Sequence, residues 1–177
     1  TRSMLYVTHV ELGFEPDRLI AVGASFPAGV FDDRRIETYW RDADQLLTSM
    51  PQIESTSLAL FPPFARANMI ATGAKDGRQF TIYFNRTDAQ FFSTAGIQLR
   101  RGRAFTRGEV TSHAPVAVIS ETAAREWFGN DDPLGRLVDR FDAPSLRIIG
   151  IAAEAVTTRI RQGWSATVYS PLEADDY

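Results

Sequence analysis

The stretch "PVAVISETAAREWFGNDDPLG", residues 115–135, holds a strand, a helix and a turn in immediate succession. Residues 115–119 form a short apolar run, which predicts a buried strand. Ser120 is placed to cap a helix that runs through Trp127 and Phe128 and stops at Gly129. The Asp-Asp-Pro-Leu-Gly sequence that follows is typical of a turn. We therefore expect a strand that passes directly into a helix.

The clearest helix signal lies upstream, at residues 32–50. Apolar side chains recur there on one face at the 3.6-residue period. Asp32 is placed to cap this helix, and Pro51 stops it. A helix with such a face has to bury it, and we expect it to lie on a sheet.

The remaining segments predict short strands and one further short helix. A capping box at residues 87–90 is expected to open that helix, and Gly96 to end it. Three helices among short strands predict an α+β fold with antiparallel pairing rather than a doubly wound parallel sheet. The expected strands are residues 19–25, 53–60, 68–73, 78–85, 147–153 and 167–169, of which 68–73 and 78–85 form a hairpin.

Composition narrows the class of protein. The chain has 177 residues, 44% of them hydrophobic, and a formal net charge of −3, so it favours a globular domain with no electrostatic drive toward nucleic acid. It has no cysteine, which excludes disulfides and thiolate metal sites. No apolar run approaches the roughly 18 residues that span a bilayer, and residues 1–14 do not resemble a signal peptide. For a role outside the cytoplasm, targeting information is expected outside these residues.

The basic stretch "FFSTAGIQLRRGRAFTRGE", residues 91–109, raises the question of a phosphate-binding loop. A Walker-type loop leads from its glycines through lysine into a helix, whereas no helix is expected after residues 103–106. An RNA-reading strand would carry alternating aromatics beside the basic residues. We expect instead a glycine-assisted bend that packs Phe105 inward and turns the arginines outward: Arg100, Arg101, Arg103 and Arg107.

Candidate nucleophiles and metal ligands lack a recognisable arrangement. His9 and His113 have no ligand spacing around them. Ser112 precedes a histidine but lacks the strand-to-helix elbow that presents a catalytic serine. We therefore predict no metal-binding and no cofactor-binding residue.

Three acidic residues lie near apolar segments. Glu121 and Glu126 are expected on the exposed face of the capped helix, with Glu121 favoured near its N-terminus. Glu154 follows a strand, and it is the one acid for which we expect a perturbed pKa. Because none has an evident catalytic partner in the sequence, no catalytic residue is predicted.

The order of these segments resembles a known family, the MacB-type periplasmic core domain of FtsX-like ABC transporter permeases. Among its branches, the chain looks most like the permeases common in soil acidobacteria. Residues 152–154 and Trp127 depart from the family's usual residues. The resemblance covers roughly residues 12–172 and is carried in order by "VELGFEPDRLIAV", "YWRDADQLLTSMPQIESTSLA", "NRTDAQFFSTAGIQLRRGRAFTRGE", "APVAVISETAAREWFGNDDPLGRLV" and "LRIIGIAAEAVTTRIRQGWSATVYSPL".

The resemblance implies a fold of two lobes. A porter-like helix-on-sheet lobe would comprise residues 1–86 and 165–177. A smaller mixed α/β lobe, Sabre-like, would be inserted as residues 87–164.

The resemblance also implies a role without catalysis. The domain would lie in the periplasm, tethered to the inner membrane, and transmit ATP-driven conformational change. Its implied partners are flanking membrane helices of its own chain, a second copy or paralogous domain, a cytoplasmic ABC ATPase and a periplasmic protein. Neither cofactor nor nucleic acid is implied.

Three other functions stay open from the residues. A ligand- or peptide-binding sensor could use aromatics near breaks in structure, namely Phe61, Phe64, Trp127 and Trp164. An enzyme would need Glu154 beside a second titratable group in a deep cleft. A nucleic-acid binder would need the four arginines to join a wider basic face.

Overall fold

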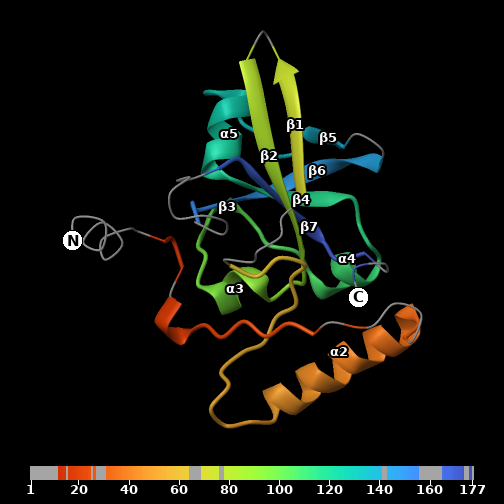
Figure 1. Ribbon diagram of the computed structural model, residues 1–177. Coiled ribbons are helices and arrows are strands. Elements are labelled where there is room, and N and C mark those ends of the chain that lie inside the picture. The colour runs from red at the N-terminus through yellow and green to blue at the C-terminus, as the bar shows by residue number, and fades with distance from the viewer. Residues whose placement is uncertain are drawn as a thin grey trace, which may run out of the picture.

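A computed structural model describes residues 12–14, 16–24, 26, 31–63, 69–75, 78–140, 143–155, 165–173 and 176. Within these residues, seven strands form one mixed sheet (Figure 1). Six of them follow the order β1-β2-β7-β4-β6-β3, and β5 pairs with β6. Their bounds are β1 (Met69–Lys75), β2 (Arg78–Thr87), β3 (Leu99–Gly102), β4 (Val116–Ser120), β5 (Leu137–Arg140), β6 (Ala143–Ala152) and β7 (Thr167–Pro171).

The sheet confirms the α+β class and corrects the expected pairing. Two pairs, β2 with β7 and β4 with β6, are parallel, whereas the other four pairs are antiparallel. A parallel pair needs a crossover connection, and the chain supplies one for β4 and β6 through the helix that follows β4. The sheet is therefore mixed rather than purely antiparallel.

One 3-10 turn and four α-helices accompany the sheet in the described part of the chain. Residues 115–135 form the predicted strand, helix and turn. Ser120 accepts a hydrogen bond from the Ala123 amide at 3.2 Å, and the helix ends at Gly129. The helices are η1 (Pro16–Arg18), α2 (Asp33–Thr48), α3 (Phe91–Ala95), α4 (Arg107–Thr111) and α5 (Glu121–Phe128).

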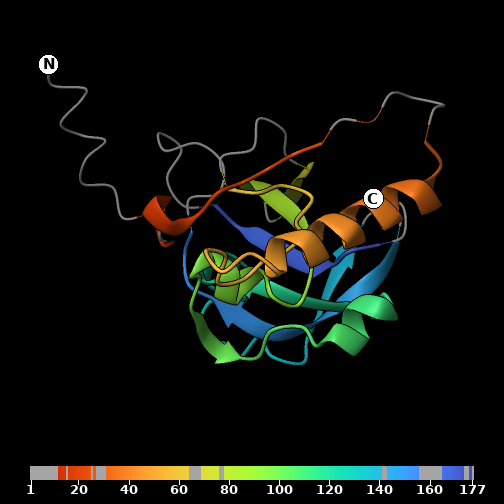
Figure 2. The ribbon, with the colours of Figure 1, turned by 90° about the horizontal axis from the view of Figure 1, so that it is seen from below.

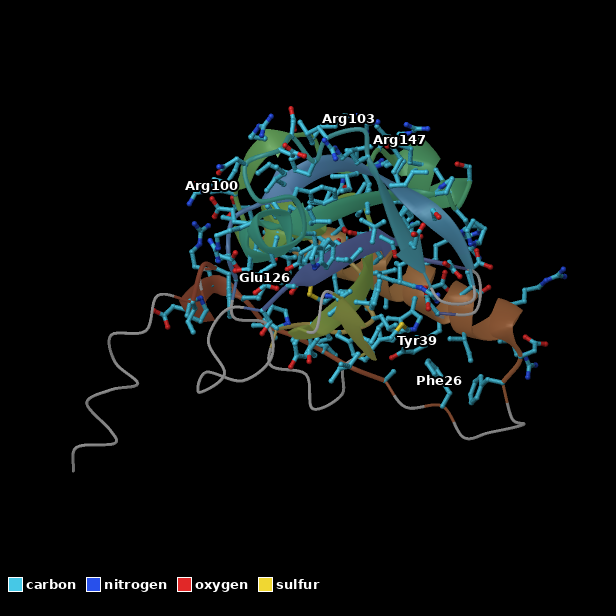
Figure 3. The ribbon with its side chains drawn as sticks, turned by 90° about the horizontal axis from the view of Figure 1, so that it is seen from above. Phe26, Tyr39, Arg100, Arg103, Glu126 and Arg147 are labelled. Atoms are coloured by element: carbon cyan, nitrogen blue, oxygen red, sulfur yellow. The ribbon has the colours of Figure 1, made fainter. Side chains whose placement is uncertain are left out.

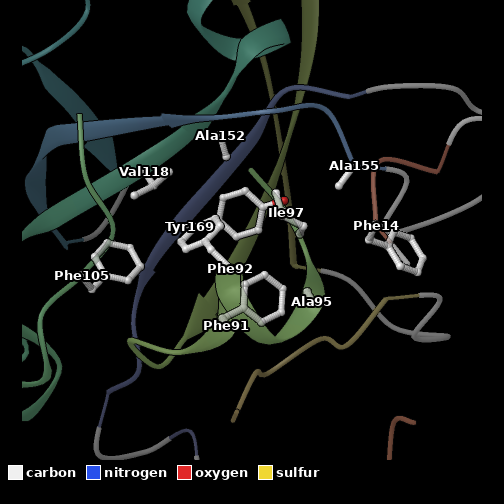
Figure 4. Packing of buried hydrophobic residues seen from close by; sticks show 10 residues of the cluster. All are labelled: Phe14, Phe91, Phe92, Ala95, Ile97, Phe105, Val118, Ala152, Ala155 and Tyr169. Atoms are coloured by element: carbon white, nitrogen blue, oxygen red, sulfur yellow. The ribbon is translucent and has the colours of Figure 1, made fainter. Parts of the chain in front are cut away.

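Two hydrophobic cores cover the two faces of the sheet. Because side chains alternate along a strand, Val118 enters one core while Ala117 and Ile119 enter the other. The α3-side core contains Phe14, Phe91, Phe92, Ala95, Ile97, Phe105, Val118, Ala152, Ala155 and Tyr169 (Figure 4). The α5-side core contains Ile82, Ala117, Ile119, Ala123, Val138, Leu146, Ile148, Ile151, Ala166 and Val168.

The predicted helix at residues 32–50 forms as α2, and the Arg35 amide donates to Asp32 Oδ1 at 2.8 Å as its N-terminal cap. It does not lie on the sheet as expected. No α2 side chain that the structure describes is buried, and none joins either core. Figure 1 shows α2 below the strands, and in Figure 2, seen from below, α2 lies in front of them. It is held instead to the following segment, where Thr48 Oγ1 lies 3.3 Å from Thr56 Oγ1.

Two predicted strands are corrected in the same region. Residues 19–24 adopt no strand, and residues 53–60 contribute only an isolated bridge between Ala59 and Thr87. A strand needs a hydrogen-bonded neighbour, and the described sheet offers none beside residues 19–24. The predicted hairpin is confirmed, since β1 and β2 pair from Met69–Phe84 to Lys75–Arg78.

The predicted capping box at residues 87–90 is wrong. Thr87 is the buried last residue of β2, and Asp88 instead accepts from the amides of Leu58 and Gln90. The helix α3 begins without a side-chain cap, although it ends at Gly96 as predicted. Thr87 stays in β2 because it pairs with Pro171 on one side and with Ala59 on the other.

The division into two lobes at residues 86 and 165 stays a prediction. The described sheet crosses both positions, because β7 pairs with β2 on one side and with β4 on the other. Any motion between such lobes would have to use this shared strand.

Candidate functional site

The arginine-rich stretch folds into β3, a bend and the short helix α4. Gly102 has a φ of +70°, and a Cβ there would lie 2.2 Å from the Ile149 carbonyl oxygen. The predicted glycine bend is thus confirmed, and Phe105 is buried as expected. A helix does begin after residues 103–106, which corrects our expectation. Its capping box pairs Thr106 with Glu109.

Three of the four arginines lie beside carboxylates. Arg103 makes two 2.7 Å hydrogen bonds to Glu109, whose pKa this pair lowers to about 2. Figure 3 shows Arg100, Arg103 and Arg147 on the side opposite Phe26 and Tyr39. The other pairs are Arg101 with Asp132 at 2.7 Å and Arg100 with Glu121 at 3.5 Å. These carboxylates offset the charge of three of the four arginines, and that no phosphate binds this stretch stays a prediction.

Glu154 lies at the end of β6 and is 8% exposed. Its Oε1 accepts a hydrogen bond from the Thr122 amide at the start of α5. Burial raises the pKa of Glu154, while the hydrogen bonds from Thr122 oppose that shift. The pKa of Glu154 is shifted as expected, but Glu154 is not the one acid affected: burial also raises the pKa of Asp88, and hydrogen bonds lower the pKa values of Glu109 and Asp132. The carboxylate of Glu154 satisfies an orphan amide of the helix, which is a structural role.

A cavity of about 630 Å³ adjoins Glu154. Arg100 and Glu121 pair with each other in its lining, and Arg125 donates to Thr122 Oγ1 at 2.9 Å. The charged groups around the cavity therefore already have partners within the protein. Among its described lining residues are Leu12, Phe14, Gln98, Arg100, Glu121 and Glu154.

The remaining candidates do not converge. His113 Nδ1 lies 2.8 Å from the Leu172 carbonyl oxygen, and Ser112 Oγ donates weakly to the Glu109 carbonyl oxygen at 3.5 Å. Glu126 is exposed on α5. His9 lies outside the described residues. Among the residues that the structure describes, no group of three or more histidines, cysteines or acids is placed to hold a metal ion.

Of the four aromatic residues proposed for a groove, the structure describes Phe61 and Trp127. Trp127 packs against the α5-side core, and Phe61 is half-buried after the isolated bridge. Phe64 and Trp164 lie outside the described residues. Neither Phe61 nor Trp127 lines the cavity near Glu154. The sequence does not predict that this cavity lies beside Gly13 and Phe14, because these residues and Glu154 are far apart in the chain.

No helix in the described part of the chain is both long and apolar enough to cross a membrane. The model of the MacB-like periplasmic core domain family matches residues 6–176, nearly the whole chain. The chain belongs to this family. It is an extracytoplasmic domain of a MacB-like ABC transporter permease.

Relatives of the MacB-like periplasmic core domain agree in sequence. The macrolide export ATP-binding/permease protein MacB of Aggregatibacter actinomycetemcomitans is 27% identical over 149 residues, covering 82% of this chain and 22% of that protein. The protein of the same name from Mannheimia succiniciproducens is 37% identical over 65 residues, covering 37% of this chain and 10% of that protein. The chain thus spans about a fifth or less of these relatives.

Solved structures agree in fold. The periplasmic region of MacB from Actinobacillus actinomycetemcomitans matches with a TM-score of 0.51 and 25% identity, covering 73% of this chain and 54% of that one. The extracellular domain of the transporter YknZ from Gram-positive bacteria matches with a TM-score of 0.53 and 18% identity, covering 73% and 60%. The second likeness concerns the fold alone. The family is one of transporter-permease domains, with no enzyme family indicated.

Proposed function

We propose that this domain is a non-catalytic mechanical element, which carries ATP-driven conformational change from the membrane into the periplasm. The observation that carries the proposal is the single sheet that runs from β2 through β7 to β4 and β6. Both faces of that sheet are packed, so a displacement at one strand moves the others with it. Such a body suits a lever.

The polar groups support the same role. The arginines and acids of the β3–α4 region bind one another, and the buried Glu154 caps α5. In the proposed assembly, flanking helices of the same chain anchor the domain. Its partners are a second copy or paralogous domain, a cytoplasmic ABC ATPase that supplies the motion, and a periplasmic protein that receives it. The relatives are named for macrolide export, and an efflux role is proposed here by analogy.

A steric clamp tests the proposal in the full-length transporter. Glu126 is exposed, and residues 1–177 contain no cysteine, so Glu126→Cys is a unique label site in this domain once cysteines elsewhere are removed. Biotin is attached there, and streptavidin is then added as a bulky obstacle. In the proposed mechanism, movement of this domain is a required step of the hydrolysis cycle, so hindering the domain should slow ATP hydrolysis by several-fold.

The control is the biotinylated transporter without streptavidin, which should hydrolyse ATP at the parent rate. A second control carries the label on a cytoplasmic loop. Unchanged hydrolysis with streptavidin bound to every domain would show that the ATPase does not drive this domain, and the mechanical role would be abandoned.

The cavity beside Glu154 supports a second candidate function, an extracytoplasmic sensor for a ligand or peptide. Its volume of about 630 Å³ falls within the size range of small-molecule sites, roughly 300–1,000 Å³. Its lining also holds Arg100 and Glu154, whose contacts with Glu121 and with the Thr122 amide a charged ligand would have to replace. A zwitterionic short peptide would match such a lining.

Thermal unfolding against a library of tripeptides tests this candidate. A sensor should show a saturable rise in Tm with one class of peptide, and Glu154→Gln together with Arg100→Ala should abolish that rise. A Tm that no peptide changes at millimolar concentration removes this candidate.

A further inference from the structure

The main chain at Gly13 passes directly against the end of β6. Gly13 has a φ of +74°, a backbone conformation that residues other than glycine rarely adopt. A Cβ there would lie 1.8 Å from the Glu154 carbonyl oxygen and 3.0 Å from Ala155 Cα. Both the conformation and the space therefore require glycine.

Phe14 turns this close approach into a packed contact. It is 8% exposed and belongs to the α3-side core. Figure 4 shows its ring at the edge of that core, near Ala155. Leu12 is half-buried and packs against the same core. Residues 12–14 thus dock through the side chains of Leu12 and Phe14, and the space at Gly13 between them has no room for a Cβ.

The structure that receives residues 12–14 is firmly held. The strand β6 pairs with β3, β4 and β5, more neighbours than any other strand of the described sheet. Just beyond its end, the Ala153 amide donates to the Gln98 carbonyl oxygen at 2.8 Å. Glu154 then joins this end to the first turn of α5. A load applied at residues 12–14 would therefore enter the sheet directly.

The segment that follows residue 14 has no buried side chain among residues 16–24, although Leu19 is half-buried against the α3-side core. Ile20 is 81% exposed and Val22 is 70% exposed. The helix α2, reached after them, contributes no side chain to either core among the residues described. A load carried along this route would move α2 before it moved the sheet.

We propose that residues 12–14 form a latch, by which the chain entering the domain is fastened to the end of β6. Motion of the preceding chain is passed through this latch to the sheet, and α2 lies off the direct path. The part of the inference that concerns motion rests on the proposed mechanical function. The latch itself does not.

Chymotrypsin tests the latch in the 177-residue chain, because it cleaves after aromatic residues. Phe14 is buried while the latch is closed, whereas Phe92, 2% exposed, reports unfolding of the core. We expect Gly13→Ala to accelerate cleavage after Phe14 by about tenfold or more, since strain and close contact both oppose docking, with cleavage after Phe92 little changed.

Two variants separate the causes. Gly13→Asn tolerates positive φ but carries a Cβ, so it should also open the latch, because the close approach alone is sufficient. Gly135→Ala is the matched control: Gly135 has a φ of +80° and nothing within 4 Å of a built Cβ. It should leave cleavage after Phe14 at the parent rate.

If Gly13→Ala unfolds the chain, Leu12→Ala provides a milder opening with the same expected preference for cleavage after Phe14. The latch is overturned if these variants cleave after Phe14 no faster than the parent. It is equally overturned if cleavage after Phe14 and after Phe92 accelerates by the same factor, since the contact would then be ordinary core packing.

The full-length transporter tests the path of motion. With the clamp at Glu126→Cys in place, Gly13→Ala should hydrolyse ATP at close to the unclamped rate, because the domain is no longer driven. Persistent inhibition in Gly13→Ala, with the latch shown open by chymotrypsin, contradicts the path but leaves the mechanical function standing. No inhibition in the parent contradicts the mechanical function and leaves the latch standing.

Discussion

At the scale of single residues, Arg103 and Glu109 show how an arginine in the basic stretch is paired within the protein. Glu109 accepts from Arg103 and also from the Thr106 amide, so one carboxylate neutralises an arginine and caps α4. An outside phosphate would have to displace both contacts. The pattern Thr-x-x-Glu that predicts this cap is present in the sequence at residues 106–109.

Replacing Glu109 should reveal a pH-dependent contribution to stability. Its pKa falls from 4.5 to about 2 on folding, so its stabilisation is present above pH 4.5 and is lost as the pH falls toward 2. Glu109→Gln should lower the free energy of unfolding by about 1 kcal/mol at pH 7, the scale of an exposed pair with a cap. Urea unfolding at several pH values measures this, with Glu126→Gln as the control. An effect that persists undiminished at pH 2 contradicts the ionic origin.

Glu154 should behave in the opposite sense. Burial raises its pKa, so the ionised form is disfavoured in the folded state, and stability falls as pH rises through the folded pKa. Glu154→Gln keeps an acceptor for the Thr122 amide without the charge and should not destabilise the chain at pH 7. Glu154→Ala leaves that amide unpaired and should cost about 1–3 kcal/mol.

The measurement is again the free energy of unfolding, for both variants at pH 4 and pH 7. Equal losses for glutamine and alanine would mean that the negative charge itself is required, and the role of Glu154 as a helix cap would have to be withdrawn.

At the scale of elements, β4 and α2 differ sharply in their contribution to stability. Ile119 in β4 is fully buried between neighbouring strands and α5. Leu46 in α2 is 60% exposed despite the helix's strong amphipathic pattern. The apolar face of α2 is thus only partly covered by described residues: the ring of Phe26 packs edge-on against Tyr39 and Trp40, while Leu46 stays exposed.

Alanine substitutions should show this difference. Ile119→Ala is expected to cost about 3 kcal/mol or more, because it leaves a cavity in a closely packed core. Leu46→Ala should change stability by less than about 0.5 kcal/mol. Thermal or urea unfolding of the 177-residue chain compares them. Similar losses for both variants would indicate that α2 is part of the cooperative core.

Local signals in the sequence predicted the elements that local contacts stabilise. Ser120, Asp32 and Gly96 begin or end helices through bonds within a few residues, and each prediction is confirmed. Residues 19–25 and 53–60 have the composition of strands, but a strand also requires a neighbour that sequence alone does not supply. The Gly13–Glu154 contact joins distant segments and has no local signal.

At the scale of the whole molecule, one sheet with two packed faces behaves as a single body, to which residues 12–14 are fastened at β6. Figure 1 shows α2 below that body. In the proposed role, a domain with this construction would transmit displacement without a reactive site. The source of that displacement would be the ATPase of the permease.

The most direct test is the distance between two copies of the domain in the full-length transporter. Pulsed electron–electron double resonance measures this distance. Spin labels at Glu126→Cys report it in lipid nanodiscs, without nucleotide and with ATP trapped. The account predicts a distance distribution that shifts with trapped ATP and does not shift in a variant whose ATPase cannot bind nucleotide. A distribution that is the same in every nucleotide state would contradict it.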